Sequence, residues 1–128
     1  MSFREDMYDL IIDYDEPDMF TELNQDRIIS NAIRQSGFSL TYDTHTGNIE
    51  EEIESSQYDT ISMFYKLYAL EKIGNKYIKS AISVSDEEGS GDFKERAKLI
   101  KEKIDSIKNS QLYKRKTYKK IFAVLHND

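Results

Sequence analysis

The fold is decided by the stretch from Ser55 to Lys108, SSQYDTISMFYKLYALEKIGNKYIKSAISVSDEEGSGDFKERAKLIKEKIDSIK. Apolar residues recur at intervals of three and four on both sides of a polar segment that contains Gly89 and Gly91. This spacing is typical of amphipathic helices, and clustered Gly, Ser and Asp are typical of a connecting turn. The stretch therefore predicts two helices joined by a turn at residues 84–93.

The first predicted helix begins near a cap at Ser55 or Ser56, ends at about Ser83 and is apolar on two faces. One face surrounds Gly74 and contains Met63, Leu67, Leu70, Tyr77 and Ala81, whereas the other contains Tyr58, Ile61, Tyr65 and Tyr68. Two apolar faces indicate either a central core helix or a helix shared with a neighbouring subunit. Together they exceed what a 128-residue monomer easily buries, which favours a partner. Glycine costs about 1 kcal/mol in a helix interior, so Gly74 indicates a close helix crossing.

The second predicted helix has a single narrow apolar seam. Asp92 and Glu95 form a capping box, so we expect the helix to open at Asp92. Its seam repeats at intervals of four and three and consists of Phe93, Ala97, Ile100, Ile104 and Ile107. A seam of this width packs antiparallel against the preceding helix.

The residues before Ser55 predict smaller elements. Residues 3–14 have helical spacing and are followed by Pro17, which disfavours helix at the residue before it. A second helix is expected from a cap at Thr21 or Asn24 to about Ser36, with Gly37 as a left-handed terminator.

Residues 38–53 alternate in polarity and contain a turn-like segment, which favours a small β-hairpin or an irregular excursion. The predicted fold is mainly α: a small helical bundle around a long central helix and an antiparallel helical hairpin. We assign residues 1–111 to one helical domain and residues 112–128 to a basic and aromatic arm, which folds as a helix or strand or becomes ordered on a partner.

Composition limits the class of protein. The chain has 128 residues, of which 38% are hydrophobic and 33% are charged, and it contains no cysteine. It therefore has no disulfides, and no run is apolar enough to predict a membrane span or a secretory signal. We expect a cytoplasmic origin and no membrane partner.

The net charge of −6 conceals a difference between the two parts of the chain. Residues 1–59 contain three basic and fifteen acidic residues, whereas residues 60–128 contain fifteen basic and nine acidic residues. This asymmetry indicates a partner-binding end, a nucleic-acid contact or head-to-tail self-association, unless the two parts compensate each other within the fold.

The sequence contains no arrangement of residues typical of catalysis or cofactor binding. Asp43-x-His45-x-Gly47 resembles the start of a calcium loop, but its glycine is at position five rather than six. The two histidines lack the spacing of a zinc site, and no serine lies in a nucleophile motif. We expect no enzyme activity, no metal and no cofactor.

The C-terminal arm combines basic and aromatic residues: Tyr113, Lys114, Arg115, Lys116, Tyr118, Lys119, Lys120 and Phe122. Such a segment binds either phosphates and bases or an acidic protein surface. The acidic first half of the chain favours protein binding.

The residues from Tyr58 to Ile107 resemble the head–tail connector (adaptor or head-completion) proteins of long-tailed bacteriophages. In that family a long apolar helix is followed by a loop rich in Gly, Ser and Asp and by a helix opening Phe-x-x-Arg-Ala-x-x-Leu. Here the corresponding segments are ISVSDEEGSGDF (82–93) and ERAKLI (95–100). The short first helix and the helix that ends at Gly37 also follow that layout, whereas residues 38–53 and the basic arm depart from it.

The resemblance implies a structural virion protein. Copies would form a homo-oligomeric ring between the capsid portal protein and a tail or stopper protein, with DNA present only as the transiting genome. The ring would assemble in the host cytoplasm and lie at the head–tail interface of the virion. The face with Tyr58, Ile61, Tyr65 and Tyr68 would contact a neighbouring subunit, and the arm would hold the portal. The alternatives are a nucleic-acid-associated or regulatory adaptor that uses the basic arm, and another phage tail-completion protein.

Overall fold

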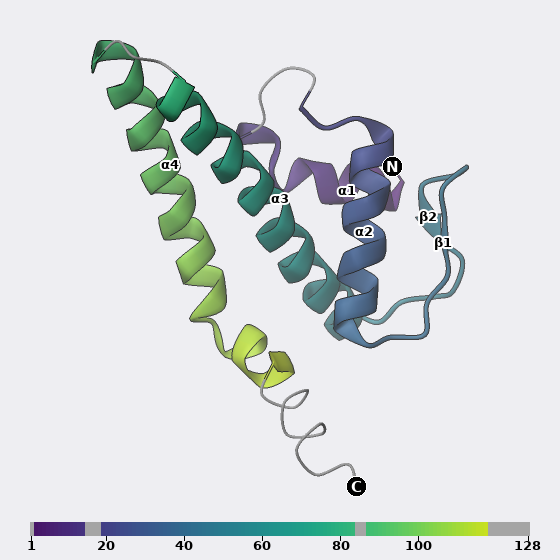
Figure 1. The fold of residues 1–128 in the computed structure, drawn as a ribbon. Helices are drawn as coiled ribbons and strands as arrows, with labels where there is room; N and C mark the ends of the chain where they lie inside the picture. The colour runs from purple at the N-terminus through teal and green to yellow at the C-terminus, as the bar shows by residue number, and fades with distance from the viewer. Residues whose placement is uncertain (1, 15–18, 84–86, 118–128) are drawn as a thin grey trace, which may run out of the picture.

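Helix α3 (Ser55–Ser83) is the central element of the computed structural model, which describes residues 2–14, 19–83 and 87–117. Helices α1 (Phe3–Asp9) and α2 (Glu22–Ser36) contact one side of α3, and α4 (Glu87–Lys108) packs along another (Figure 1). The structure confirms the prediction of a mainly helical chain, a small bundle around a long helix with an antiparallel helical hairpin.

Helix α3 begins at Ser55 itself, so its cap position is Glu54 rather than either predicted serine. The Gln57 side chain accepts a hydrogen bond from the Glu54 N–H at 3.0 Å, which satisfies a backbone donor before the first turn. The helix reaches Ser83, as predicted, and residues 84–86 that follow lie outside the described residues.

Helix α4 runs antiparallel to α3, as successive contacts show. Tyr77 faces Arg96, with 5.8 Å from the ring centroid to the guanidinium carbon, and Gly74 faces Ile100. A Cβ on Gly74 would lie 3.1 Å from Ile100 Cγ2. The expected close crossing at Gly74 is therefore confirmed.

The predicted start of α4 at Asp92 is wrong, because the helix already begins at Glu87. Each helical glycine costs roughly 1 kcal/mol relative to alanine, which weakens a helix without forbidding it. Asp92 is thus an interior helical residue, and part of the predicted turn, residues 84–86, lies outside the described residues.

Helix α2 follows its sequence signals closely. The Thr21 side chain accepts a hydrogen bond from the Asn24 N–H at 3.2 Å, and Gly37 ends the helix with φ +78°. Its apolar residues, spaced to share one face, are buried: Ile28, Ile29, Ala32 and Ile33. The choice between Thr21 and Asn24 as cap is resolved in favour of Thr21.

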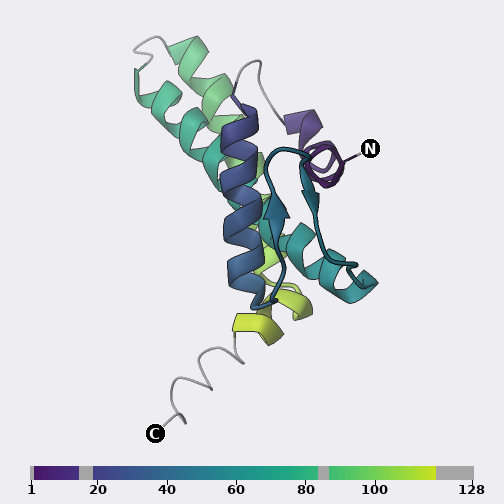
Figure 2. The same cartoon turned by 90° about the vertical axis from the view of Figure 1, so that its right-hand side faces the viewer.

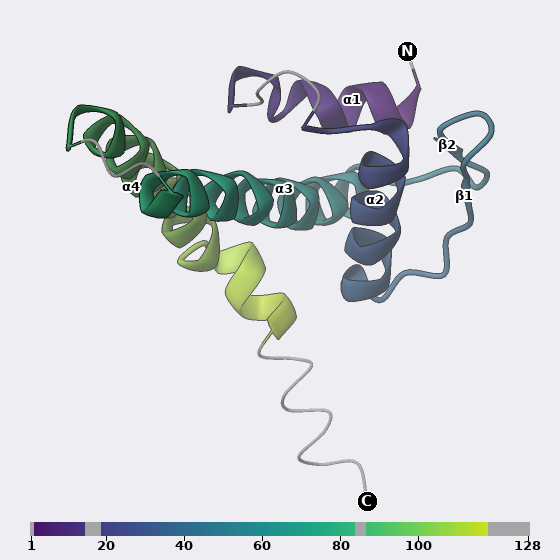
Figure 3. The ribbon, with the colours of Figure 1, turned by 45° about the horizontal axis from the view of Figure 1, so that its top comes forward.

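The N-terminal segment is a helix followed by a single 3₁₀ turn, η1 (Ile12–Tyr14). Ser2 caps α1 by accepting a hydrogen bond from the Glu5 N–H. Figure 3 shows α1 along one side of α3, with α4 on the other side. The expected break at Pro17 lies outside the described residues.

The segment after Gly37 contains the predicted small β-hairpin. Strands β1 (Tyr42–Asp43) and β2 (Asn48–Ile49) pair antiparallel, with Tyr42 opposite Ile49. Figure 2 shows the hairpin beside α2. Gly47, at φ +73°, ends the turn, and a Cβ there would approach Arg4 Nη1 to 3.0 Å.

Candidate functional site

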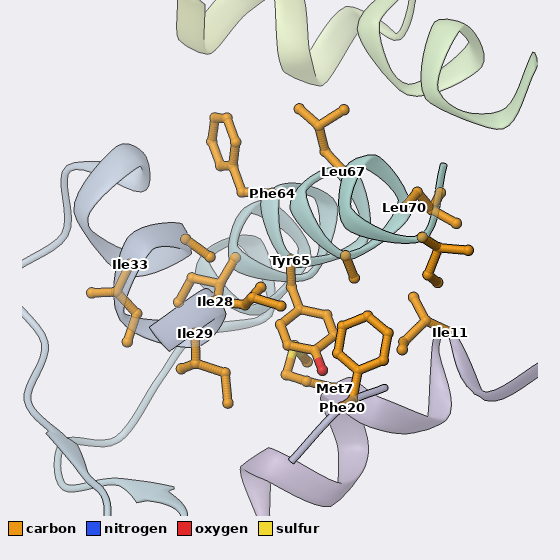
Figure 4. Close-up of a cluster of buried hydrophobic side chains, with 14 of the residues drawn as sticks. Met7, Ile11, Phe20, Ile28, Ile29, Ile33, Phe64, Tyr65, Leu67 and Leu70 are labelled. Carbon is orange, nitrogen blue, oxygen red and sulfur yellow. The ribbon is translucent and has the colours of Figure 1, made fainter. Parts of the chain in front are cut away.

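Two members of the predicted subunit-contact face of α3 lie in the core of the chain itself. Ile61 and Tyr65 both have 0% exposure, and Tyr65 points toward Met7 of α1 and toward Phe20 (Figure 4). On another face of α3, Phe64 and Leu67 point toward α4. The second apolar face is therefore covered by α1 and α2, and the assignment of Ile61 and Tyr65 to a subunit interface is wrong.

Tyr58 and Tyr68, the other two residues of that face, lie partly exposed at its edges. The Tyr58 ring meets Phe3 edge-on at 5.9 Å, and burial together with the nearby charge of Asp6 raises the pKa of Tyr58. The Tyr68 ring stacks on Phe64 at 6.0 Å, and burial together with Glu71 raises the pKa of Tyr68. These two tyrosines keep surface that a partner can reach.

The base of the C-terminal arm is helical over residues 111–117. Ser110 Oγ accepts a hydrogen bond from the Tyr113 N–H at 3.2 Å, as a helix cap does. Tyr113 packs against Phe64 at 6.2 Å between ring centroids, and Lys116 Nζ lies 4.5 Å above the Phe38 ring. These contacts dock one side of the segment onto the body of the protein.

The other side of the same helix faces solvent. Lys114 and Arg115 are exposed, so the basic segment is divided into a docked side and an outward side. Four further residues of the predicted arm lie outside the described residues: Tyr118, Lys119, Lys120 and Phe122.

A groove that the sequence analysis did not identify runs between α3 and α4. Its apolar lining consists of Gly74, Ile78, Ala97, Ile100 and Ile104. Ile78 is 49% exposed although it lies beside these residues. Three exposed lysines, Lys94, Lys98 and Lys101, complete the α4 side of the groove.

A polar cluster of Arg4, Asp26 and Tyr42 joins α1, α2 and the β-hairpin. The Arg4 guanidinium donates to both Asp26 carboxylate oxygens, through Nε at 2.8 Å and Nη2 at 3.2 Å. The Tyr42 hydroxyl donates to Asp26 Oδ1 at 2.5 Å, and Arg4 Nη2 also donates to the Thr44 carbonyl at 2.6 Å. The cluster fixes the hairpin against α2.

Two groups of this cluster, Arg4 and Tyr42, have raised pKa values. Hydrogen bonding to Asp26 raises the pKa of Arg4, so the guanidinium stays charged. Burial, followed by the hydrogen bond to Asp26 and its negative charge, raises the pKa of Tyr42 far above its ordinary value. The charged and polar groups of the cluster are partnered with one another, so the cluster serves to hold α1, α2 and the β-hairpin together. The sequence contained one signal of it: Arg4 is one of three basic residues among the first 59.

We expect the stability difference between the protein and a Tyr42→Phe variant to shrink as the pH rises above about 10. The folded chain holds the Tyr42 proton more tightly than the unfolded chain does. The stabilisation is therefore complete below the ordinary pKa of 10.0 and is lost as the pH rises toward the folded-state pKa. Urea unfolding of both proteins at about pH 8 and about pH 10.5 measures the change, and a difference that does not vary with pH would contradict the assignment.

Within residues 2–14, 19–83 and 87–117, no three His, Asp or Glu side chains come together in a way that could hold a metal ion. In the same parts of the chain, no helix has both the length and the apolar character needed to span a lipid bilayer. Comparison with profiles of known protein families, with curated protein sequences and with solved structures gives no match.

Proposed function

We propose that the protein is a head–tail connector of a long-tailed bacteriophage. Copies form a ring between the capsid portal and the tail, extend the DNA channel and present a docking surface to a tail or stopper protein. The protein assembles in the host cytoplasm and becomes part of the virion. It performs no catalysis and needs no cofactor.

The arrangement of the helices supports this proposal. The structure contains the elements on which the resemblance to connectors rests: a short helix, a helix that ends at Gly37, and a long central helix paired with an antiparallel helix. The bundle buries its own core, so its exterior remains available for contacts with neighbours.

The observation that carries the proposal is the two-sided base of the C-terminal arm. Tyr113 and Lys116 hold this helix on the body, while Lys114 and Arg115 point outward. A docked helix with an outward basic side is preorganised to bind an acidic surface, because its position is fixed before binding and less ordering is required. In a connector, that surface belongs to the portal.

The charge distribution supports the same function. The first 59 residues carry the acidic excess and form α1, α2 and the β-hairpin. An acidic wall repels DNA phosphates, so a genome can pass along it without adhering. The basic second part supplies complementary charge for neighbouring proteins.

The test is binding to the portal ring encoded in the same genome. Removing residues 112–128 would also remove the Tyr113 contact with Phe64, so the cleaner truncation ends at Thr117. We expect that truncation, combined with Lys114→Glu and Arg115→Glu, to weaken portal binding at least about tenfold, by loss of complementary charge at the interface. The helical circular dichroism should stay unchanged.

The matched control for this experiment is Lys103→Glu, which reverses an exposed charge on α4 away from the arm. This control should bind the portal as the unmodified protein does. Equal portal binding by the truncated, charge-reversed variant and the unmodified protein would show that the arm does not hold the portal.

A nucleic-acid adaptor is the second candidate, favoured by the exposed lysines of α4 together with Lys114 and Arg115. Such an adaptor binds free DNA or RNA as a monomer, with an affinity that falls steeply as salt increases. A connector shows little affinity for free DNA. Measuring DNA binding at about 50 and 200 mM salt separates the two functions.

A further inference from the structure

The groove between α3 and α4 has an apolar floor that the described parts of the chain leave partly uncovered. Ile78 is 49% exposed, and it lines the groove beside Ala97 and Ile104. An apolar surface of this kind gains free energy when a partner removes it from water. The groove therefore needs an occupant with at least one apolar side chain.

The rim of the groove selects the charge of that occupant. Lys94, Lys98 and Lys101 are exposed along its α4 side, and no ion pair joins them to a carboxylate in the described parts of the chain. The one acidic lining residue, Glu71, already lies 3.7 Å from Lys108 Nζ. The groove thus favours an apolar side chain flanked by acids.

The chain itself carries such a surface at the end of α1 and the start of η1. Ile12 is 50% exposed, and the exposed carboxylates of Asp9 and Asp13 lie within three residues of it in the chain. Its neighbour Ile11 is fully buried, so the core holds this segment in place. We call Asp9, Ile12 and Asp13 the acidic end.

The acidic end and the groove of one copy lie on different sides of α3. Figures 1 and 3 place α1 on one side of α3 and α4 on the other. At 3.6 residues per turn, Ile78 lies nearly opposite Tyr65, the residue that points toward α1. The acidic end therefore cannot enter the groove of its own chain.

We propose that the acidic end of one copy docks in the α3–α4 groove of the next, with Ile12 on the apolar floor and Asp9 and Asp13 beside the lysines. This inference rests on the proposed function for its premise that copies associate. Contacts between two different surfaces repeat from copy to copy and produce a ring or an open filament.

Cross-linking tests the contact directly, because the natural chain has no cysteine. Ile12→Cys and Ile78→Cys variants, distinguished by tags of different mass, are mixed and treated with a short bis-maleimide. We expect heterodimers of these two variants at about ten times the yield of a control mixture. The double variant, Ile12→Cys with Ile78→Cys, should give a ladder of dimers, trimers and larger products.

The control mixture uses Leu23→Cys and Leu99→Cys. Both leucines are exposed, at 59% and 48%, one in the acidic part of the chain and one on α4 outside the groove lining. A heterodimer yield equal to this control would overturn the proposal. A predominance of homodimers of the Ile12→Cys variant would overturn it too, because such dimers indicate a symmetric contact.

Charge reversal gives a second, independent readout. Lys98→Glu with Lys101→Glu should reduce the heterodimer yield at least about fivefold, and Asp9→Lys with Asp13→Lys on the other partner should restore it, since opposite charges again face each other. Failure of the second pair to restore the yield would refute the charge pairing. Portal binding measured on the same variants separates the two proposals. Cysteine variants that bind the portal but form no cross-link would refute this interface and leave the proposed function standing.

Discussion

Replacing Tyr65 with alanine is expected to lower the free energy of unfolding by about 3 to 5 kcal/mol, the range for truncating a large buried aromatic side chain. Tyr65 is 0% exposed and extends from α3 toward Met7 and Phe20. Its loss leaves a cavity that α1 and α2 fill only in part. Urea unfolding followed by helical circular dichroism measures the change, and the loss is a large share of the roughly 5 to 15 kcal/mol typical of such domains.

Tyr68→Ala is the matched control, because Tyr68 comes from the same predicted face but remains partly exposed. Its ring stacks on Phe64 at 6.0 Å, so we expect a loss of only about 1 to 2 kcal/mol. Should Tyr65→Ala unfold like the unmodified protein yet lose self-association, Tyr65 would belong to a subunit interface and its placement in the core would be wrong.

Replacing Asp26 with alanine is expected to cost about 2 to 4 kcal/mol, somewhat less than breaking a fully buried ion pair. The carboxylate accepts hydrogen bonds from Arg4 and Tyr42, and the side chains of Arg4 and Asp26 are each 13% exposed. The substitution leaves a nearly buried guanidinium without its main partner and disconnects the hairpin from α2. Urea unfolding measures the loss.

Glu22→Ala provides the comparison, since Glu22 approaches the same guanidinium. Its Oε1 lies 3.8 Å from Arg4 Nη1, but its side chain is 80% exposed. An exposed ion pair of this kind contributes at most about 1 kcal/mol. Similar losses from the two alanine variants would mean that burial does not distinguish the two carboxylates, contrary to the structure.

The features that the sequence predicted well depend on neighbouring residues. Thr21 caps α2 through the N–H three residues later, and Gly37 ends it in a conformation that glycine adopts without strain. The reach of α3 to Ser83 and the seam of α4 around Ile100 likewise follow helical spacing. Short-range chemistry of this kind can be read from the chain directly.

The start of α4 was not predictable from its local signals. A capping box at Asp92 and Glu95 favours a start there, but α4 begins at Glu87. A cap pattern indicates where a helix can begin and does not prevent an earlier start. The intervening glycines only lower the helical propensity.

Two features that join distant residues, the polar cluster and the groove, could not be predicted from the chain. Arg4, Asp26 and Tyr42 come from three different elements, and periodicity contains no information about such pairing. The groove beside Gly74 was hidden for the same reason, since it depends on how α4 lies against α3. Only the charge asymmetry pointed to the acidic and basic surfaces.

The two apolar faces of α3 are compatible with either a central core helix or a helix shared with a neighbouring subunit, and in the structure α3 is the central core helix. Their extent favoured a subunit contact, because the sequence alone does not reveal that α1 and α2 cover one face while α4 covers the other. Tyr65 is buried by the first pair of helices, and Leu67 faces α4. A partner is therefore to be sought at the groove, at Tyr58 and Tyr68, and at the base of the arm.

Native mass spectrometry of the protein mixed with portal rings from the same genome tests the connector function most directly. Assembly as a connector predicts a portal complex that carries many copies of the protein, with the fully loaded ring as the dominant species at saturation. It also predicts that the variant truncated after Thr117 and reversed in charge at Lys114 and Arg115 loses most of this binding. Spectra that show only portal rings without bound protein, together with free monomer, at every mixing ratio would contradict the proposed function.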